Sequence, residues 1–502
     1  MDTHETATAP IAIIGGGVSG ALTAYHLIRQ NPKARVIVVD SSPSLGLGLA
    51  YATPSYRHLL NVPAGKMSAL PDEPDHFLTW LRANHDPQAE PTTAQPMTAE
   101  PMTAQPMTFA PRAVFGRYIQ SLLASVSGIE HLSARVVDLK LARNRAVLTC
   151  DDGRTLEARA VVLALGNFDP AELPGITQQA RRAGVYRHNA WAADTFDGLD
   201  PDAPITLIGT GLTGVDVVLR LRELGHTGTI TAVSRHGIFP RRHAPYAALG
   251  QSAIPRGTPA TCLAYLRAFR QALRTGTEWR AAVDSLRATT NELWLALPVE
   301  EQRRFRRHLQ RRWDVVRHRM APSIADIIDA ELQAGTLCVR KGGLQAVALD
   351  GARASVTIRT PAGNQRFETA RVINCTGPST HYRRVGSPLL TSLFMQGLVV
   401  DGPLGGGLRT SQTGAVIDAA GQESAVLFSV GPGRLGTLLE SIAVPEIRTQ
   451  AAELACTLQT ATQQPEAEPH KAATLYNAES MVNAVSMVNA VSMVLASRGA
   501  VA

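Results

Sequence analysis

Residues 11–20 read IAIIGGGVSG, four apolar residues followed by glycines at positions 15, 17 and 20. The apolar run predicts a buried strand, and the residues after it have helical spacing. Gly15 permits a tight turn, Gly17 lets a pyrophosphate approach the backbone, and Gly20 allows a helix to pack closely on the strand. Asp40 ends the next apolar run, twenty residues after Gly20, where a carboxylate accepts hydrogen bonds from a ribose. This stretch therefore predicts a dinucleotide-binding fold.

The pattern occurs a second time at residues 205–214, ITLIGTGLTG. Gly209, Gly211 and Gly214 again follow an apolar run and open a helix. The next strand ends near Arg235, twenty-one residues after Gly214, where the first copy has an acid. An arginine at this point can pair with the 2′-phosphate of NADPH, although one arginine does not decide between NADPH and NADH. The chain is therefore predicted to be an α/β protein with two Rossmann-like domains. Two dinucleotide folds in one chain suggest a flavin and a nicotinamide working together, with FAD in the first fold and NAD(P)H as co-substrate in the second.

Two further apolar runs end in glycine and predict connections between these domains. Residues 160–165 precede Gly166, and residues 371–373 lead through Cys375 to Gly377. In flavoproteins with two dinucleotide folds, such strands mark crossings between the domains, and both glycines are predicted to contact cofactor. The alternative for each run is an ordinary buried strand and turn. Cys375 is expected to be a buried thiol.

The strand and helix signals divide the chain into four parts. Residues 91–108 repeat a five-residue unit rich in Pro and Thr, and residues 480–494 repeat SMVNAV. Both repeats predict segments without regular structure. The first predicted part is an FAD-binding part over 1–200, with a flexible insertion at 91–108. An NAD(P)H-binding domain follows over 201–345, with three or four helices in 258–334. A second FAD-binding part covers 346–458, with a last helix from near Leu435, and a loosely ordered tail covers 459–502.

Composition limits the other function classes. The 502 residues carry a net charge of +7, but acidic residues accompany the basic ones and nucleic-acid motifs are missing, so no nucleic-acid partner is expected. The five cysteines are scattered, which argues against a metal site and suits a reducing cytoplasm. No apolar segment has the length of a membrane span, and the N-terminus has no secretory character. We expect a cytoplasmic protein with a small-molecule substrate.

Several stretches resemble bacterial FAD/NAD(P)-binding monooxygenases, a family that includes an FAD-dependent urate hydroxylase and aspartate N-hydroxylases. The resemblance spans about residues 10–450. It is carried by GLGLAY at 46–51, HLLNVPA at 58–64, PRxxFGxY at 111–118, IGTGLTGVD at 208–216, WDVVRHRMAP at 313–322 and AVPEIR at 443–448.

The resemblance implies a flavin monooxygenase that uses NAD(P)H and O₂, most similar to the enzyme that converts urate to 5-hydroxyisourate in purine degradation. The same-class alternative is N-hydroxylation of an amino acid such as aspartate. A second alternative is a flavin-binding regulatory or electron-transfer protein without oxygen insertion. An anionic substrate calls for forked, charged donors, and the candidates are Arg112, Arg317, His318 and Arg319. No catalytic acid or base is predicted.

Overall fold

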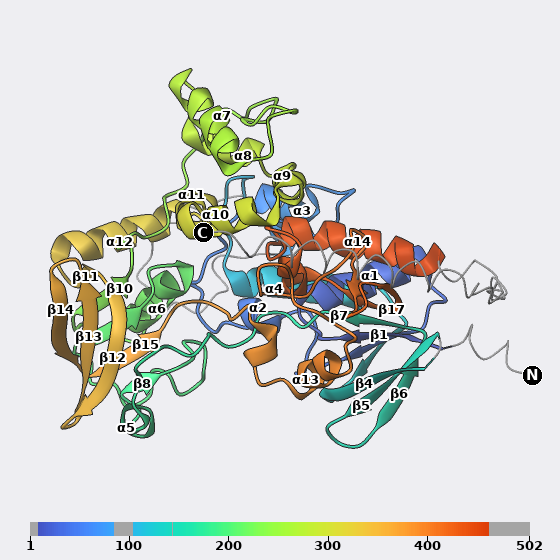
Figure 1. Ribbon diagram of the computed structural model, residues 1–502, viewed down its shortest axis with the longest axis horizontal. Helices are drawn as coiled ribbons and strands as arrows, with labels where there is room; N and C mark the ends of the chain where they lie inside the picture. The colour runs from blue at the N-terminus through green and yellow to red at the C-terminus, as the bar shows by residue number, and fades with distance from the viewer. Residues whose placement is uncertain (1–8, 85–103, 143, 461–502) are drawn as a thin grey trace, which may run out of the picture. The chain divides into compact units, whose positions relative to one another are not determined.

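The first sheet carries the first glycine loop. The computed structural model describes residues 9–84, 104–142 and 144–460, and Figure 1 shows their helices and strands. In this sheet the strands lie in the order β16-β17-β7-β1-β2-β3, all parallel to their neighbours except the edge strand β16. Their bounds are Ala415–Ile417 (β16), Glu423–Ser429 (β17), Ala160–Leu163 (β7), Ile11–Ile14 (β1), Val36–Val39 (β2) and Ile129–Leu132 (β3).

The central strands are short and apolar because helices and loops cover both faces of a parallel sheet. Every residue of β1, β2 and β7 is buried. Helix α1 (Val18–Gln30) follows β1 and shares a core with α14 (Val444–Thr460), the two lying side by side in Figure 1. Gln459 of α14 donates to the carbonyl of Leu27 at 3.0 Å. The C-terminal part of the described chain thus closes the domain that the N-terminal part begins.

The second sheet carries the second glycine loop and is parallel throughout. Its order is β11-β10-β9-β15-β8. The bounds are Leu337–Lys341 (β11), Ile230–Ser234 (β10), Ile205–Ile208 (β9), Arg371–Asn374 (β15) and Tyr186–Arg187 (β8). Helix α6 (Leu212–Glu223) follows β9. The arrangement confirms the predicted fold class of two Rossmann-like domains.

Each large sheet is accompanied by a small antiparallel one. The first comprises β4 (Val136–Ala142), β5 (Arg145–Cys150) and β6 (Thr155–Ala158), which share a core with the first sheet and with α13 (Pro388–Met395). The second comprises β12 (Gly343–Asp350), β13 (Arg353–Thr360) and β14 (Gly363–Thr369), which share a core with the second sheet. Both insertions therefore belong to the domain whose sheet they cover.

The segment between β10 and β11 is helical, but it forms six helices where the sequence predicts three or four. They are α7 (Cys262–Arg274), α8 (Trp279–Ser285), α9 (Thr290–Ala296), α10 (Val299–His308), α11 (Gln310–Arg317) and α12 (Pro322–Ala334). Gly276, at φ +94°, follows the end of α7, and Pro298 precedes α10. The apolar residues keep helical spacing across these short interruptions. A prediction from this spacing alone therefore counts neighbouring helices as one.

The predicted domain boundaries at 200 and 345 need correction. Strands β8 and β15 lie in the second sheet because they pair parallel to each other, and β15 also pairs with β9. The second domain therefore begins before β8 and extends through β15, and the later FAD-binding part starts after Gly377 rather than at residue 346. The remaining helices of the first domain are α2 (Gly48–Tyr51), α3 (His76–Asn84) and α4 (Arg112–Ala124), and α5 (Gln178–Arg182) precedes β8.

Three other predictions concern segments near the repeats and the end of the chain. Most of the predicted insertion and nearly all of the predicted tail lie outside the described residues. Residues 104–108 are ordered against the first domain, where Gly65 donates to the carbonyl of Pro106 at 2.9 Å. The last helix begins at Val444 rather than near Leu435. Pro445 is its second residue, and proline is favoured in the first turn of a helix but disrupts a helix interior. In the described part of the chain, no helix is long and apolar enough to cross a membrane.

Candidate functional site

The first glycine loop has the geometry that a bound pyrophosphate requires. Gly15 has φ +107°, and a Cβ on it would lie 2.3 Å from the carbonyl oxygen of Ala164. A Cβ on Gly20 would lie 1.9 Å from the carbonyl oxygen of Gly15. Gly17 precedes the first turn of α1, and its Cβ position is only in ordinary contact with Gly48, 3.5 Å away. The outer glycines are therefore required by the backbone, and the middle one leaves the helix N-terminus open to an anion.

Asp40 lies directly beside this loop, at the end of β2. One carboxylate oxygen accepts a hydrogen bond from the amide of Gly16 at 2.5 Å, and the other accepts from the amide of Ser42 at 2.7 Å. These bonds fix the carboxylate next to the helix N-terminus while leaving lone pairs available. The residues Gly15, Gly17, Gly20 and Asp40 thus fit the adenosine pyrophosphate of FAD.

The second glycine loop repeats this geometry. Gly209 has φ +126°, and a Cβ on it would lie 2.4 Å from the carbonyl oxygen of Cys375. A Cβ on Gly214 would lie 2.7 Å from the carbonyl oxygen of Gly209. At Gly211, no described atom other than its own chain neighbours lies within 4 Å of the Cβ position. The loop fits a second dinucleotide, and Arg235 lies exposed just after β10.

The two predicted crossing segments meet between the glycine loops. Gly166 and Gly377 both have positive φ, +66° and +86°. Beyond them the chains pair, since Ser379 donates from its amide to the carbonyl of Asp169 at 3.0 Å. A cavity of about 180 Å³ lies beside this pairing, and its lining includes Leu49, Ala50, Arg112, Trp191, Leu212, Thr213 and Gly377. The cavity is therefore bordered by both dinucleotide folds, where two cofactors would approach each other.

The resemblance implies that Arg112 binds the substrate. In the structure its charge is already paired with a carboxylate. It is the first residue of α4, and its guanidinium lies 2.8 Å from the carboxylate of Asp216 on α6. Its Nε also donates to the carbonyl of Leu59 at 3.2 Å. Asp216 pairs with this charge, so Arg112 links the two dinucleotide folds, and its contact with a substrate stays a prediction.

His58 is part of the same link and is not identified as a site residue from the sequence. Its Nε2 lies 3.0 Å from the carbonyl oxygen of Asp216, and its Nδ1 lies 2.6 Å from Oγ1 of Thr53. Burial lowers the pKa of His58, with Asp216 opposing the effect. The HLLNVPA stretch at 58–64 begins with His58, so this motif could have indicated it as a site residue.

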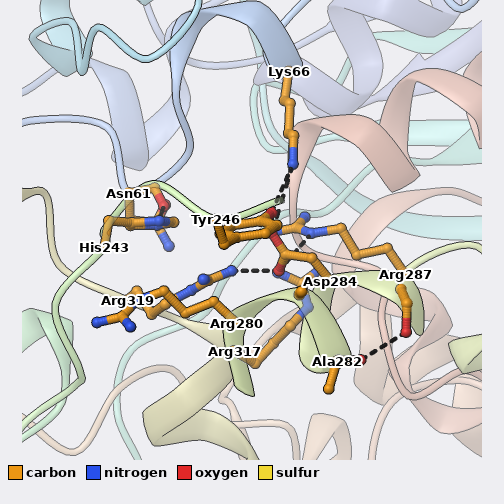
Figure 2. Close-up of polar contacts among 12 residues, drawn as sticks. Asn61, Lys66, His243, Tyr246, Arg280, Ala282, Asp284, Arg287, Arg317 and Arg319 are labelled. Carbon is orange, nitrogen blue, oxygen red and sulfur yellow. Dashed lines mark hydrogen bonds and ion pairs between the residues drawn. The ribbon is translucent and has the colours of Figure 1, made fainter. Parts of the chain in front are cut away.

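A second charged group lies where the first domain, the loop after β10 and the helical segment meet. We call Lys66, Tyr246, Asp284, Arg287 and Arg319 the Asp284 cluster. Figure 2 shows their side chains converging on the carboxylate of Asp284. Arg319 forms a close ion pair with it, and the hydroxyl of Tyr246 donates to it. Nζ of Lys66 and Nε of Arg287 lie 3.6 and 3.5 Å from its oxygens.

The protonation states in this cluster follow from burial and charge. Burial by itself would raise the pKa of Asp284, but Arg287, Tyr246, Arg319 and Lys66 outweigh it and lower the pKa, so the group is ionised. Burial together with Asp284 raises the pKa of Tyr246 to about 12. Burial lowers the pKa of Lys66, with Asp284 opposing the effect. Three cations therefore share one carboxylate.

Arg317 and His318 lie next to this cluster, with different partners. Arg317 is buried, and its guanidinium lies 3.1 Å from Glu446 and 3.4 Å from Glu440. Burial, reinforced by Arg317 and Arg287, lowers the pKa of His318 to about 3, so its imidazole is uncharged at neutral pH. Arg317 is therefore already paired and His318 carries no charge, and binding of an anionic substrate by these two residues stays a prediction.

Of the four predicted substrate residues, Arg319 alone belongs to the Asp284 cluster. Lys66 follows the HLLNVPA stretch by two residues, so its position next to a recognised motif could have drawn attention to it. Tyr246 lies in a loop, Asp284 in α8 and Arg287 in the turn after α8, and none of them belongs to a motif. The tertiary fold brings them together, and spacing along the chain does not show it.

The comparisons with known proteins agree with this geometry. Residues 12–168 match the FAD-NAD(P)-binding family model. No curated protein matches the sequence. The ornithine N-hydroxylase of Kutzneria sp. 744, solved with reduced FAD, NADP⁺ and L-ornithine, is similar with a TM-score of 0.58 at 13% identity, covering 90% of this chain and 99% of that one. L-lysine 6-monooxygenase of Pseudomonas syringae is similar with a TM-score of 0.57 at 13% identity and the same coverage.

Ornithine hydroxylase from Pseudomonas aeruginosa is a third neighbour, with a TM-score of 0.58 at 12% identity, covering 90% of this chain and 99% of that one. At such identities the likeness concerns the fold. The family match and the two glycine loops support FAD and NAD(P)H as the cofactors of this chain. The named substrates of these neighbours are ornithine and lysine, so the comparisons lend no support to urate.

Proposed function

We propose that this protein is an FAD-dependent monooxygenase that uses NAD(P)H and O₂ to hydroxylate the amino group of a small carboxylate-bearing substrate. Bound FAD, once reduced, supplies the oxygen chemistry, and the protein binds and orients the substrate and excludes water. Solved proteins that share the fold over 90% of this chain hydroxylate ornithine and lysine, which supports this kind of reaction.

The Asp284 cluster is the observation that carries the substrate class. Three cations face one carboxylate, and the adjoining Arg317 with Glu440 and Glu446 leaves the whole group with one more positive than negative charge. Buried charges are costly unless paired, so a bound anion would stabilise this arrangement. A substrate carboxylate supplies such an anion and matches the fork of an arginine.

Lys66 is where the substrate would meet the cluster. Its side chain is 47% exposed, whereas that of Arg319 is fully enclosed, with Nε and Nη1 lacking hydrogen-bond partners among the described residues. Lys66 also donates to the hydroxyl of Tyr246 at 3.2 Å. A carboxylate that binds Lys66 would compete with Asp284 for the cluster and anchor the substrate by its charged end. The amine at the other end must be neutral to accept oxygen.

The test is substrate-dependent oxidation of NADPH and NADH by the FAD-loaded protein, with L-ornithine, L-lysine, L-aspartate and urate supplied separately. We expect an amino acid to accelerate oxidation and to yield a product one oxygen heavier by mass spectrometry. Loss of urate absorbance with equal acceleration would replace N-hydroxylation by the urate reaction. Bound flavin with no acceleration by any of them would contradict monooxygenation of these substrates.

A variant of Lys66 tests the binding mode. Lys66→Ala should raise KM for the amino acid about tenfold or more with a smaller change in kcat, since it removes an interaction made throughout the reaction. Lys140→Ala, an exposed lysine on β4, is the matched control and should leave both constants unchanged. An unchanged KM in Lys66→Ala would show that the carboxylate binds elsewhere.

A further inference from the structure

Helix α7 presents an apolar stripe to a cavity in the helical segment. Four of its residues recur at helical spacing and line this cavity: Cys262, Tyr265, Leu266 and Phe269. A helix of a folded domain normally buries such a stripe, yet none of the thirteen residues of α7 is buried. Figure 1 shows α7 beside α8, and the two helices share an apolar cluster in which most members are only partly buried.

The size of the cavity limits what it can hold. Its volume is about 270 Å³, and five aromatic side chains line it: Tyr265, Phe269, Trp294, Phe305 and Trp313. An engineered cavity of about 150 Å³ binds benzene, so this one has room for a larger apolar body. One turn of a helix with its side chains has a volume of about 400–600 Å³, from a diameter of about 10–12 Å and a pitch of about 5.4 Å. The cavity therefore fits a small molecule and not a helix of a partner protein.

The polar groups in the lining are largely bonded within the protein. Four side chains donate to acceptors of the protein itself, at distances of 2.7–3.3 Å: Tyr265, Thr290, Trp294 and Trp313. Burial, reinforced by Glu301, raises the pKa of Cys262 to about 11, so its thiol is uncharged at neutral pH. A molecule in this cavity therefore meets apolar surface, where a polar group without a partner would be costly.

Two arginines supply the charge at the cavity. Arg270 on α7 and Arg312 on α11 both line it, and both are exposed, so they lie where the cavity meets solvent. The described part of the chain gives neither of them an ion-pair partner, and no carboxylate of the described residues lines the cavity. A guanidinium binds a carboxylate through two parallel hydrogen bonds and repels a cation. The charge at this cavity therefore favours an anionic end group.

We propose that this cavity binds a carboxylate with an apolar body, of the size of a medium-chain fatty acid. The body lies among the aromatic side chains, and the carboxylate lies on Arg270 and Arg312. Burial of apolar area supplies the affinity, and the two arginines select the head group. Among the described residues that line the cavity, none belongs to the Asp284 cluster. The site is therefore separate from the one proposed for the amino-acid substrate, and it stands whether or not the protein is a monooxygenase.

The experiment is calorimetric titration of the FAD-loaded full chain with octanoate. Octan-1-ol and octylammonium test the head group, and butanoate tests the length of the body. We expect octanoate to bind at least tenfold more tightly than each of the other three. Equal affinity for octanoate and octan-1-ol would show that the arginines do not select a carboxylate, and this result or an absence of octanoate binding would overturn the proposal.

Variants of the lining place the ligand within the chain. Arg270→Ala and Arg312→Ala should each weaken octanoate at least fivefold and change the affinity for octan-1-ol less than twofold. Leu266→Trp should fill the cavity and weaken both ligands at least tenfold. The matched control is Arg267→Ala, since this exposed arginine also lies on α7 but does not line the cavity, and it should leave both affinities unchanged.

Flavin content and far-ultraviolet circular dichroism equal to those of the parent chain show that each variant is folded. Unchanged octanoate binding in Leu266→Trp would place the ligand elsewhere and overturn the proposal. Sedimentation of the chain with vesicles of anionic phospholipid, weakened by the same arginine variants while octanoate does not bind, would instead assign these cations to a membrane surface.

Discussion

The two glycine loops have the same backbone and opposite chemistry at the following strand. Gly15 and Gly209 both have positive φ, and in each case a Cβ would lie within 2.4 Å of a carbonyl oxygen from the neighbouring crossing segment. In the first fold the next strand ends at Asp40, whose carboxylate faces its own loop. In the second it ends beside Arg235, among cations.

The glycine at the start of each loop is required by backbone sterics. The residue at the end of the following strand depends instead on the nucleotide that binds. Positive φ and close backbone approach leave glycine as the residue that fits, whichever cofactor binds. A carboxylate accepts the hydroxyls of a ribose but repels a 2′-phosphate, whereas arginine attracts it. The same fold can therefore hold two nucleotides in one chain and keep them from exchanging places.

The largest effect on the bound cofactor is expected from breaking the shared backbone. Gly15→Ala places a methyl 2.3 Å from a main-chain oxygen that cannot move aside, at φ +107°. Strain of this kind costs about 1–3 kcal/mol before any rearrangement, and the loop must also shift away from the pyrophosphate. We expect loss of FAD and a Tm lowered by several degrees, measured by flavin absorbance per chain and by thermal unfolding. A variant with full flavin content and an unchanged Tm would show that the loop adapts.

The next effect comes from breaking the link between the folds. Arg112→Ala leaves Asp216 buried without its partner, and removing one member of a buried pair costs about 3–5 kcal/mol. The arginine side chain is 16% exposed, so we expect the lower end of this range. Chemical unfolding with flavin fluorescence as the probe measures it. The double variant Arg112→Met with Asp216→Leu should recover most of the loss; a double variant as unstable as Arg112→Ala would argue against the ion pair as the cause.

The comparison also explains which features the sequence predicts. Strands such as β1 and β2 and the helix α1 follow local patterns, apolar runs and helical spacing, and the structure has these elements where the patterns lie. The outer glycines of each loop are equally predictable, because the backbone leaves no room for a Cβ at any of them. Arg112 lies in the expected motif, but the sequence does not show that Asp216 of the other dinucleotide fold pairs with it. Lys341 and Asp284 have no motif at all, and strand register and helix packing determine where they lie.

A smaller effect separates the roles of the glycines within one loop. Gly211→Ala adds a methyl where no described atom other than its own chain neighbours lies within 4 Å, at φ −82°. The backbone should accept it, with a change of stability below about 0.5 kcal/mol. The methyl instead faces the bound pyrophosphate, and we expect NADPH affinity to fall about tenfold, or about 1.4 kcal/mol, in a fluorescence titration. Unchanged affinity would place the pyrophosphate away from this loop, and FAD content serves as the control.

The smallest effect tests a second contact between the folds through its pH dependence. Nε2 of His243, in the loop after β10, lies 3.0 Å from the carbonyl oxygen of Asn61 in the first domain. Burial, reinforced by Arg319, lowers the pKa of His243 to about 4. The folded state then binds fewer protons than the unfolded state, in which a histidine titrates near 6.5, so this group makes stability fall as the pH drops.

For His243 the loss begins near the unfolded pKa and levels off below pH 4, and linkage gives about 0.7 kcal/mol between pH 7 and pH 6. His243→Gln keeps a donor for the carbonyl of Asn61 and removes the titration. The fall in unfolding free energy over that interval should be smaller in the variant by this amount, while stability at pH 7.5 changes little. The same fall in both proteins would assign the pH dependence to other groups, such as His318, whose pKa is lowered to about 3. A variant already weakened at pH 7.5 would instead show that the contact depends on the imidazole ring itself, and not on its protonation.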